Sequence, residues 1–207
     1  RLKGRRHLVV CGSQSVGAFP VDVKRSGIDA LATAGHKWLG AGFGAGFCYV
    51  RKALLAARPP RAIGWMSGED PAAFDNRHPR LRPSNARTEI GCPPFGPIFA
   101  LGAAVDYLSG IGIDQIAERV LALNMYLTFR LGRASLEVLS PGGEHRSGET
   151  LVRLPDPARA REFLLERGVH VTGKPEGVRI STHCYNSEED VDACVAALVA
   201  YRERLLL

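Results

Sequence analysis

Residues 31–40 read LATAGHKWLG, with Lys37 near the centre of the stretch. Small residues precede this lysine, an indole follows it, and glycines continue as far as Gly46. Glycine-rich backbone of this kind indicates that another group approaches it closely. A lysine amine that is desolvated in such a pocket loses its proton readily and then attacks carbonyl carbons. The stretch therefore predicts a nucleophilic lysine rather than an ordinary surface lysine.

Short apolar runs around this stretch predict a sheet. They read as strands buried on both faces and lie at residues 7–10, 28–34 and 47–50. Ligands of open α/β sheets bind beyond the carboxyl ends of the strands. Cys11, Ser13 and Gln14 follow the first of these strands and Lys37 follows the second. We therefore expect these residues to share one edge of the sheet.

The remaining chain predicts alternating helices and strands. Helices are expected at residues 53–57, from Pro97 to about 109, at about 114–132, at 157–167, and from the Ser187 region to 205. Asp114 is expected to cap the third of these helices, and Ser187 to begin the last one in a capping box. Strands are expected at 136–139, 150–154, 169–172 and 177–181. One apolar stripe should run along the helix at 114–132, through Ile116, Val120, Leu123, Leu127 and Leu131. Residues 58–97 read as a long irregular connection.

Composition is that of a folded globular protein. The chain has 207 residues, of which 45% are hydrophobic and 23% charged, with a net charge of +6. Four positive residues cluster at its start, namely Arg1, Lys3, Arg5 and Arg6. No aromatic residues interleave with them, so we expect a solvated basic turn and no nucleic-acid partner.

Two further classes of protein are disfavoured. No apolar run reaches the length of a membrane span, so no membrane partner is expected. The 5 cysteines are scattered without metal-type pairs, so we expect a reduced cytoplasmic protein with no metal site.

Three segments carry a resemblance to a known family. They are residues 8–39, which contain VVCGSQSVG, GID and AGHKW, residues 87–91 (RTEIG), and residues 178–191, which begin VRISTHCYN. In order and spacing these segments resemble the class V aminotransferase family, which is dependent on pyridoxal phosphate and includes cysteine desulfurases and isopenicillin-N epimerase. The resemblance covers nearly the whole chain.

This resemblance implies an α/β protein of fold type I in two domains. Residues 1–110 would form the last part of the cofactor-binding large domain, with a mixed, mostly parallel sheet. Residues 111–207 would form a small α+β carboxyl-terminal domain, with the helix at about 114–132 as linker. Relatives are homodimers that act on amino acids, so the resemblance implies transamination, epimerisation or elimination of an amino acid.

The resemblance also implies a role for individual residues. Lys37 would form the Schiff base with pyridoxal phosphate and move the proton of the substrate α-carbon. Gln14 would meet the phenolic oxygen of the ring, Ser13 would pack against its face, and His36 would reach the phosphate. Arg179 would bind the substrate carboxylate, since a guanidinium offers it two parallel donors.

Three positions depart from the family pattern. Cys11 stands where the family has an aspartate that keeps the pyridine nitrogen protonated, and a neutral thiol makes the ring a weaker electron sink. Transamination should suffer more than epimerisation or elimination. Ala34 and Cys92 stand where serine and threonine supply phosphate hydrogen bonds, with Cys92 still at a cofactor-binding position. The loop at 172–176 lacks the reactive cysteine of desulfurases, which disfavours sulfur transfer.

Only ten residues precede Cys11, whereas family members carry most of their cofactor domain there. We therefore expect the carboxyl-terminal part of such an enzyme. The alternative is a non-catalytic interaction or scaffold protein derived from the family. A dinucleotide site at Gly40, Gly42 and Ala45, and a catalytic triad from Ser181, His183 and Glu189, are disfavoured because the surrounding motifs do not fit.

Overall fold

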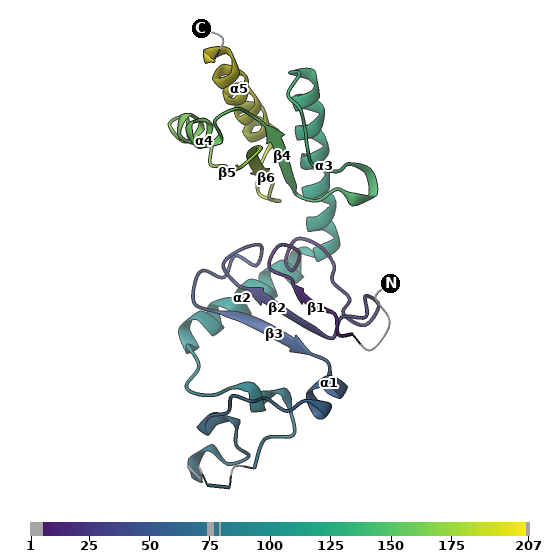
Figure 1. Cartoon of the computed structure of the whole chain (residues 1–207), viewed down its shortest axis with the longest axis vertical. Coiled ribbons are helices and arrows are strands. Elements are labelled where there is room, and N and C mark those ends of the chain that lie inside the picture. The colour runs from purple at the N-terminus through teal and green to yellow at the C-terminus, as the bar shows by residue number, and fades with distance from the viewer. Residues whose placement is uncertain (1–5, 74–76, 79, 206–207) are drawn as a thin grey trace. The chain divides into compact units, whose positions relative to one another are not determined.

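The computed structural model describes residues 6–73, 77–78 and 80–205 (Figure 1). Most of the basic cluster at the start of the chain, Arg1, Lys3 and Arg5, lies outside the described residues. The chain divides into two compact units, Arg1–Ile111 and Gly112–Leu207. No single helix in the described ranges is long and apolar enough to cross a membrane.

The first unit contains a mixed three-stranded sheet in the order β1-β2-β3. Its strands are β1 (Val9–Cys11), β2 (Ala30–Ala34) and β3 (Gly46–Val50). β1 runs parallel to β2, with Cys11 opposite Ala32, and β3 runs antiparallel to β2. All three strands lie where the apolar runs predicted them, each with a boundary shifted by one or two residues. The expected burial on both faces was wrong for β1 and β3, where Val9 and Phe47 are exposed. The parallel pair brings the carboxyl ends of β1 and β2 to the same edge.

Helix α1 (Lys52–Ala57) and helix α2 (Phe95–Ile111) complete the first unit. Between them lie three short 3-10 turns, Trp65–Ser67, Pro71–Ala73 and Asn85–Thr88, within the irregular connection that was expected. α2 begins two residues before Pro97, so the prediction of Pro97 as its first residue was wrong. A proline is tolerated in this first turn because its missing N–H would have no partner within the helix. Only Leu101 and Leu108 of α2 are buried.

Two glycines explain the close approach that the sequence predicts around Lys37. A Cβ on Gly35 would lie 2.8 Å from the carbonyl oxygen of Ala45. A Cβ on Gly17, whose φ is +96°, would lie 2.8 Å from the carbonyl carbon and oxygen of Trp38. Both contacts are closer than real Cβ atoms come, so only glycine fits at either position. The approaching group is therefore the backbone of the same unit.

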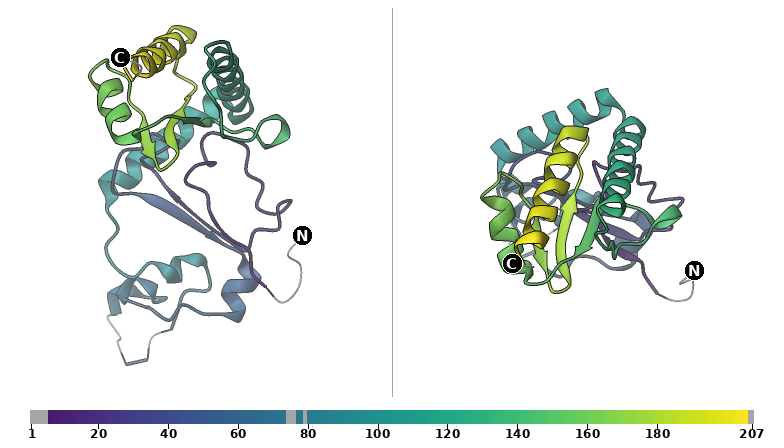
Figure 2. Two further views of the ribbon diagram at one scale, coloured as in Figure 1. Left: turned by 45° about the horizontal axis from the view of Figure 1, so that its top comes forward. Right: turned by 90° about the horizontal axis from the view of Figure 1, so that it is seen from above.

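The second unit packs three helices on an antiparallel sheet in the order β4-β6-β5. The strands are β4 (Glu149–Arg153), β5 (Thr172–Lys174) and β6 (Gly177–Ser181), and a 3-10 turn, Gly143–His145, precedes β4. The helices are α3 (Ile113–Arg133), α4 (Pro157–Leu165) and α5 (Glu188–Arg204). They lie over one face of the sheet (Figure 2), where their apolar side chains form one core with Val152, Val178 and Ile180.

The predicted apolar stripe of α3 is confirmed, since Ile116, Val120, Leu123, Leu127 and Leu131 are all buried. The capping box at the start of α5 is also confirmed: Ser187 Oγ accepts a hydrogen bond from Asp190 N, and Asp190 Oδ2 accepts one from Ser187 N. Asp114 was wrongly predicted as the cap of α3. Gly112 is the capping residue, and Asp114 lies in the first helical turn.

Two predicted strands were wrong. Residues 136–139 form only an isolated bridge, in which Val138 pairs with Val152. The predicted strand at 169–172 lies too early, because β5 spans Thr172–Lys174 and pairs with β6. Val169 and Val171 pack against the core without joining the sheet, so burial rather than strand pairing accounts for their apolar character.

Candidate active site

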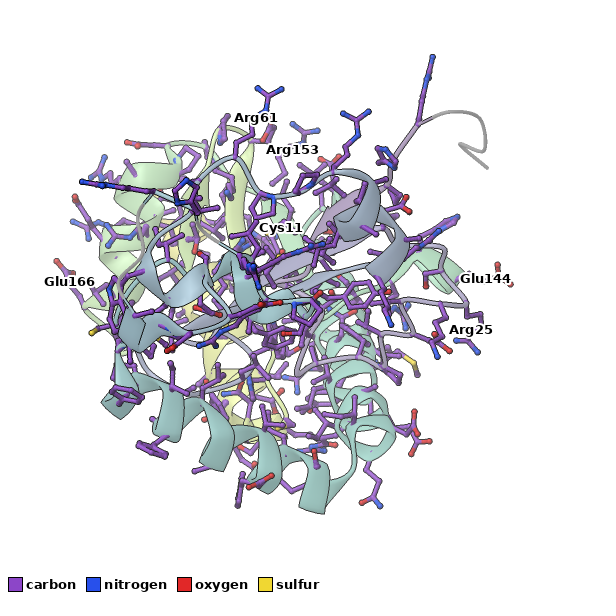
Figure 3. The ribbon with its side chains drawn as sticks, turned by 90° about the horizontal axis from the view of Figure 1, so that it is seen from below. Cys11, Arg25, Arg61, Glu144, Arg153 and Glu166 are labelled. Atoms are coloured by element: carbon purple, nitrogen blue, oxygen red, sulfur yellow. The ribbon has the colours of Figure 1, made fainter. Side chains whose placement is uncertain are left out.

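The ends of β1 and β2 bring together the first group of predicted site residues. Cys11 is the last residue of β1 and is exposed, and its side chain is labelled in Figure 3. Its Sγ lies 3.6 Å from Ser13 Oγ. Ser13 itself is buried and accepts a hydrogen bond from the backbone N–H of Ala34, at 3.0 Å. The Ser13 hydroxyl therefore joins the end of β1 to the end of β2.

The Cys11 thiol is electrostatically perturbed. Hydrogen bonds from the backbone and the hydroxyl of Ser13 lower the pKa of this thiol, and the positive charge of Lys37 lowers it further. An anionic sulfur is stabilised by donors and by a nearby ammonium group.

Gln14 and Trp38 form the second link at this edge. The indole Nε1–H of Trp38 donates to Gln14 Oε1 at 3.1 Å. Trp38 is buried and Gln14 is exposed, so the indole anchors an amide that faces outward. With its oxygen taken by the indole, the NH₂ end of the amide is the end that can donate to a ligand.

Lys37 follows β2 in a turn and its side chain is exposed. The expectation of a desolvated lysine in an enclosed pocket was therefore wrong. The small residues before it are needed for contacts within the unit, as at Gly35, and they do not wall off the amine. No carboxylate in the described part of the chain pairs with Lys37, so its amine can reach a ligand.

The first unit holds two other predicted cofactor-binding residues. His36 directly precedes Lys37, and Cys92 lies on the connection to α2. The ring of His36 is exposed and stacks on Phe43, with ring centroids 4.8 Å apart and an interplanar angle of 22°. Cys92 is exposed on the segment between the 3-10 turn Asn85–Thr88 and α2. Neither is hydrogen-bonded to Lys37, Ser13 or Gln14 within the described residues.

Arg179 belongs to the second unit, in the middle of the central strand β6. Its Nη1 lies 3.3 Å from Glu149 Oε1, and its Nη2 lies 3.5 Å from Thr172 Oγ1. Neither partner could be predicted from the sequence. Both depend on the strand register, in which Arg179 lies opposite Leu151 on one side and Thr172 on the other. Glu149 is two residues from Leu151 and so shares the face of Arg179.

A second pair was also missed. Cys184 Sγ lies 3.3 Å from His183 Nδ1 in the turn after β6, and burial lowers the pKa of His183. Cys184 is half-buried, in keeping with the expectation that it packs. No group of three or more His, Cys, Asp or Glu side chains among the described residues is placed to hold a metal ion.

The family model described as Aminotransferase class-V matches residues 3–194. The chain belongs to the class V aminotransferase family. This confirms the resemblance carried by the three segments. An isopenicillin N epimerase from Amycolatopsis lactamdurans is 34% identical over 206 residues, covering 92% of this chain and 51% of the relative. An uncharacterized aminotransferase, YcbU of Bacillus subtilis, is 28% identical over 193 residues, covering 93% of this chain and 51% of the relative.

A solved structure supports the fold class. The apo structure of a cysteine desulfurase from Thermococcus onnurineus superimposes with a TM-score of 0.86 at 25% identity, covering 96% of this chain and 53% of that one. The expected α/β fold of the class V family is thereby confirmed. The chain spans about half the length of the relatives that it matches.

Proposed function

We propose that this chain is part of a pyridoxal-phosphate-dependent enzyme that acts on an amino acid by transamination, epimerisation or elimination, with Lys37 as the residue that attaches the cofactor. One observation carries the proposal. Lys37 is exposed just beyond β2 and Cys11 is the last residue of β1, and the carboxyl ends of these two parallel strands form the edge where α/β sheets bind ligands. Membership of the class V aminotransferase family supports it.

The side chains around Lys37 suit this cofactor. A lysine amine without a carboxylate partner can condense with an aldehyde, and the outward NH₂ of Gln14 can donate to a phenolic oxygen. Ser13 presents a small side chain that is held by Ala34. When bound, pyridoxal phosphate withdraws electrons from the bonds of the substrate α-carbon.

The residues of the chain itself would transfer the proton and bind the substrate. Lys37 accepts the proton from the substrate α-carbon and returns it. Hydrogen bonds with Ser13 lower the pKa of Cys11. A thiol at this position would still make the ring of a bound cofactor a weaker electron sink than the carboxylate of the family pattern would. Arg179 binds and orients the substrate carboxylate through parallel N–H donors.

We further propose that the enzyme works as a homodimer. α2 exposes large apolar side chains, of which Phe95 is 62%, Phe99 74% and Tyr107 71% accessible, and Phe43 before β3 is 84% accessible. Large apolar side chains that are exposed in this number favour a protein partner. The 5 cysteines are all free, as a reducing cytoplasm would keep them.

The alternative function is a non-catalytic interaction protein derived from the family. Cys11 favours it, because a thiol in place of the aspartate of the family pattern makes the cofactor ring a weaker electron sink. Cofactor binding discriminates between these two functions.

Titration of the purified chain with pyridoxal phosphate, followed by visible absorption, tests the proposal. We expect a saturable absorption band in the wild type that is absent in Lys37→Ala. Lys52→Ala is the matched control, since Lys52 is an exposed lysine at the start of α1. The proposal fails if Lys37→Ala gives the same band as the wild type, or if no variant gives a band and the wild type remains colourless.

A further inference from the structure

The sheet of the second unit has one face that its helices leave uncovered. Thr150, Val152, Val178 and Ile180 point into the core and are buried. Because side chains alternate along a strand, Glu149 and Arg179 lie on the opposite face. Their side chains are 28% and 27% accessible, respectively. The uncovered face therefore carries an ion pair that is half-buried and still within reach of a ligand.

The contacts of Arg179 leave its guanidinium incompletely satisfied. Nη1 meets Glu149 Oε1 at 3.3 Å, which is longer than the roughly 2.7–2.9 Å of a strong charge-assisted hydrogen bond. Nη2 meets Thr172 Oγ1 at 3.5 Å. Nε is buried and has no hydrogen-bond partner among the described residues. Among the described residues, Arg179 contacts Glu149 through Oε1 alone, so this pair lacks the two-point geometry that a guanidinium favours.

We propose that Glu149 is an exchangeable counter-ion of Arg179, which the carboxylate of the substrate replaces. This inference rests on the proposed role of Arg179 as the carboxylate anchor. Glu149 keeps the guanidinium charge compensated while no substrate is present, and it competes with the substrate for the same N–H donors. It is thus a positioning residue that sets how tightly the site binds carboxylates.

Loose pairing makes this exchange feasible. A partly exposed ion pair contributes little free energy, because water screens both charges. A free carboxylate that approaches end-on gains two parallel hydrogen bonds in place of one long contact. The negative charge of Glu149 opposes that approach until its side chain turns away. Neutralising Glu149 should therefore tighten carboxylate binding by about fivefold, with a smaller effect at high salt.

The test is a titration of the full chain with sodium propionate at constant ionic strength, followed by the NMR resonances of arginine Nε–H groups labelled with ¹⁵N. Arg179→Lys assigns the Arg179 resonance. We expect this resonance to shift in the wild type and to reach half-saturation at about one fifth of the concentration in Glu149→Gln. Glu137→Gln is the matched control, because Glu137 pairs with Arg153 at 2.8 Å and should leave the titration unchanged.

Glu149→Asp provides a second variant should the amide disturb the sheet. It shortens the side chain and draws the carboxylate away from Arg179, so intermediate tightening is expected. The inference is overturned if both Glu149 variants bind propionate as the wild type does or more weakly, or if Arg179 does not respond in any variant. Attachment of the cofactor to Lys37 is measured separately, so failure of either proposal leaves the other open to its own result.

Discussion

Replacing Gly17 by alanine should destabilise the unit that holds Lys37. Gly17 has a φ of +96°, and an added Cβ would lie 2.8 Å from the carbonyl carbon and oxygen of Trp38. These are backbone atoms that no side-chain rotation can move aside. The turn that carries Trp38 and Lys37 must therefore shift when the methyl group is introduced.

Gly27→Ala isolates the cost of that contact. Gly27 also has a positive φ, of +67°, but an added Cβ would meet nothing within 4 Å. Left-handed backbone strain costs a non-glycine residue about 1 kcal/mol or more, and both variants bear it. Gly17→Ala adds overpacking, which costs about 1–3 kcal/mol. We therefore expect Gly17→Ala to lower the free energy of unfolding by about 1–3 kcal/mol more than Gly27→Ala does.

Urea unfolding followed by tryptophan fluorescence measures this difference. Both tryptophans of the chain, Trp38 and Trp65, lie in Arg1–Ile111, so the signal reports on the relevant unit. Equal destabilisation by the two variants would refute the reasoning that Gly17 is required by the backbone of the lysine turn. Gly17→Ala should also weaken the binding of pyridoxal phosphate, whereas Gly27→Ala should not.

Three further substitutions test other parts of the structure. Leu127→Ala should cost about 2–5 kcal/mol because Leu127 is fully buried in the second unit, whereas Met125→Ala, at an exposed position, should cost little; urea unfolding measured by circular dichroism checks both. Asp156→Ala should cost about 1 kcal/mol, since Asp156 Oδ1 caps α4 by accepting a hydrogen bond from a backbone N–H, and a thermal melt that is unchanged would contradict this. Ser13→Ala should raise the pKa of Cys11 toward its ordinary value. The folded state lowers this pKa, so the thiolate is favoured above it, and alkylation of the Cys11 peptide by iodoacetamide should shift to higher pH in Ser13→Ala. An unshifted pH profile would show that the Ser13 hydroxyl does not act on the thiol.

Local patterns predicted most of the helices and the first sheet. The apolar stripe from Ile116 to Leu131 repeats over about four helical turns, and a repeat of this length predicts a helix with one buried face. Strand positions in the second unit were harder to predict. Val169 and Val171 have the composition of a strand, yet Thr172–Lys174 pairs with β6. Pairing depends on partners distant in sequence, which a local pattern does not contain.

The candidate site, too, could be predicted from the sequence only in part. Residue order and spacing located Lys37, Ser13 and Gln14 at one sheet edge, because the ends of parallel strands coincide. The contact between Glu149 and Arg179 depends on the register of β4 against β6, and register is fixed by the folded sheet. The exposure of Lys37 likewise depends on which groups fold over it.

Chemical trapping of the cofactor tests the role of Lys37 most directly. The chain is mixed with pyridoxal phosphate, reduced with sodium borohydride, digested, and mapped by mass spectrometry. We predict a phosphopyridoxyl group on the peptide that contains Lys37, and none on that peptide in Lys37→Ala. Labelling that spreads evenly over exposed lysines such as Lys24, Lys52 and Lys174, with no preference for Lys37, would contradict the proposed function.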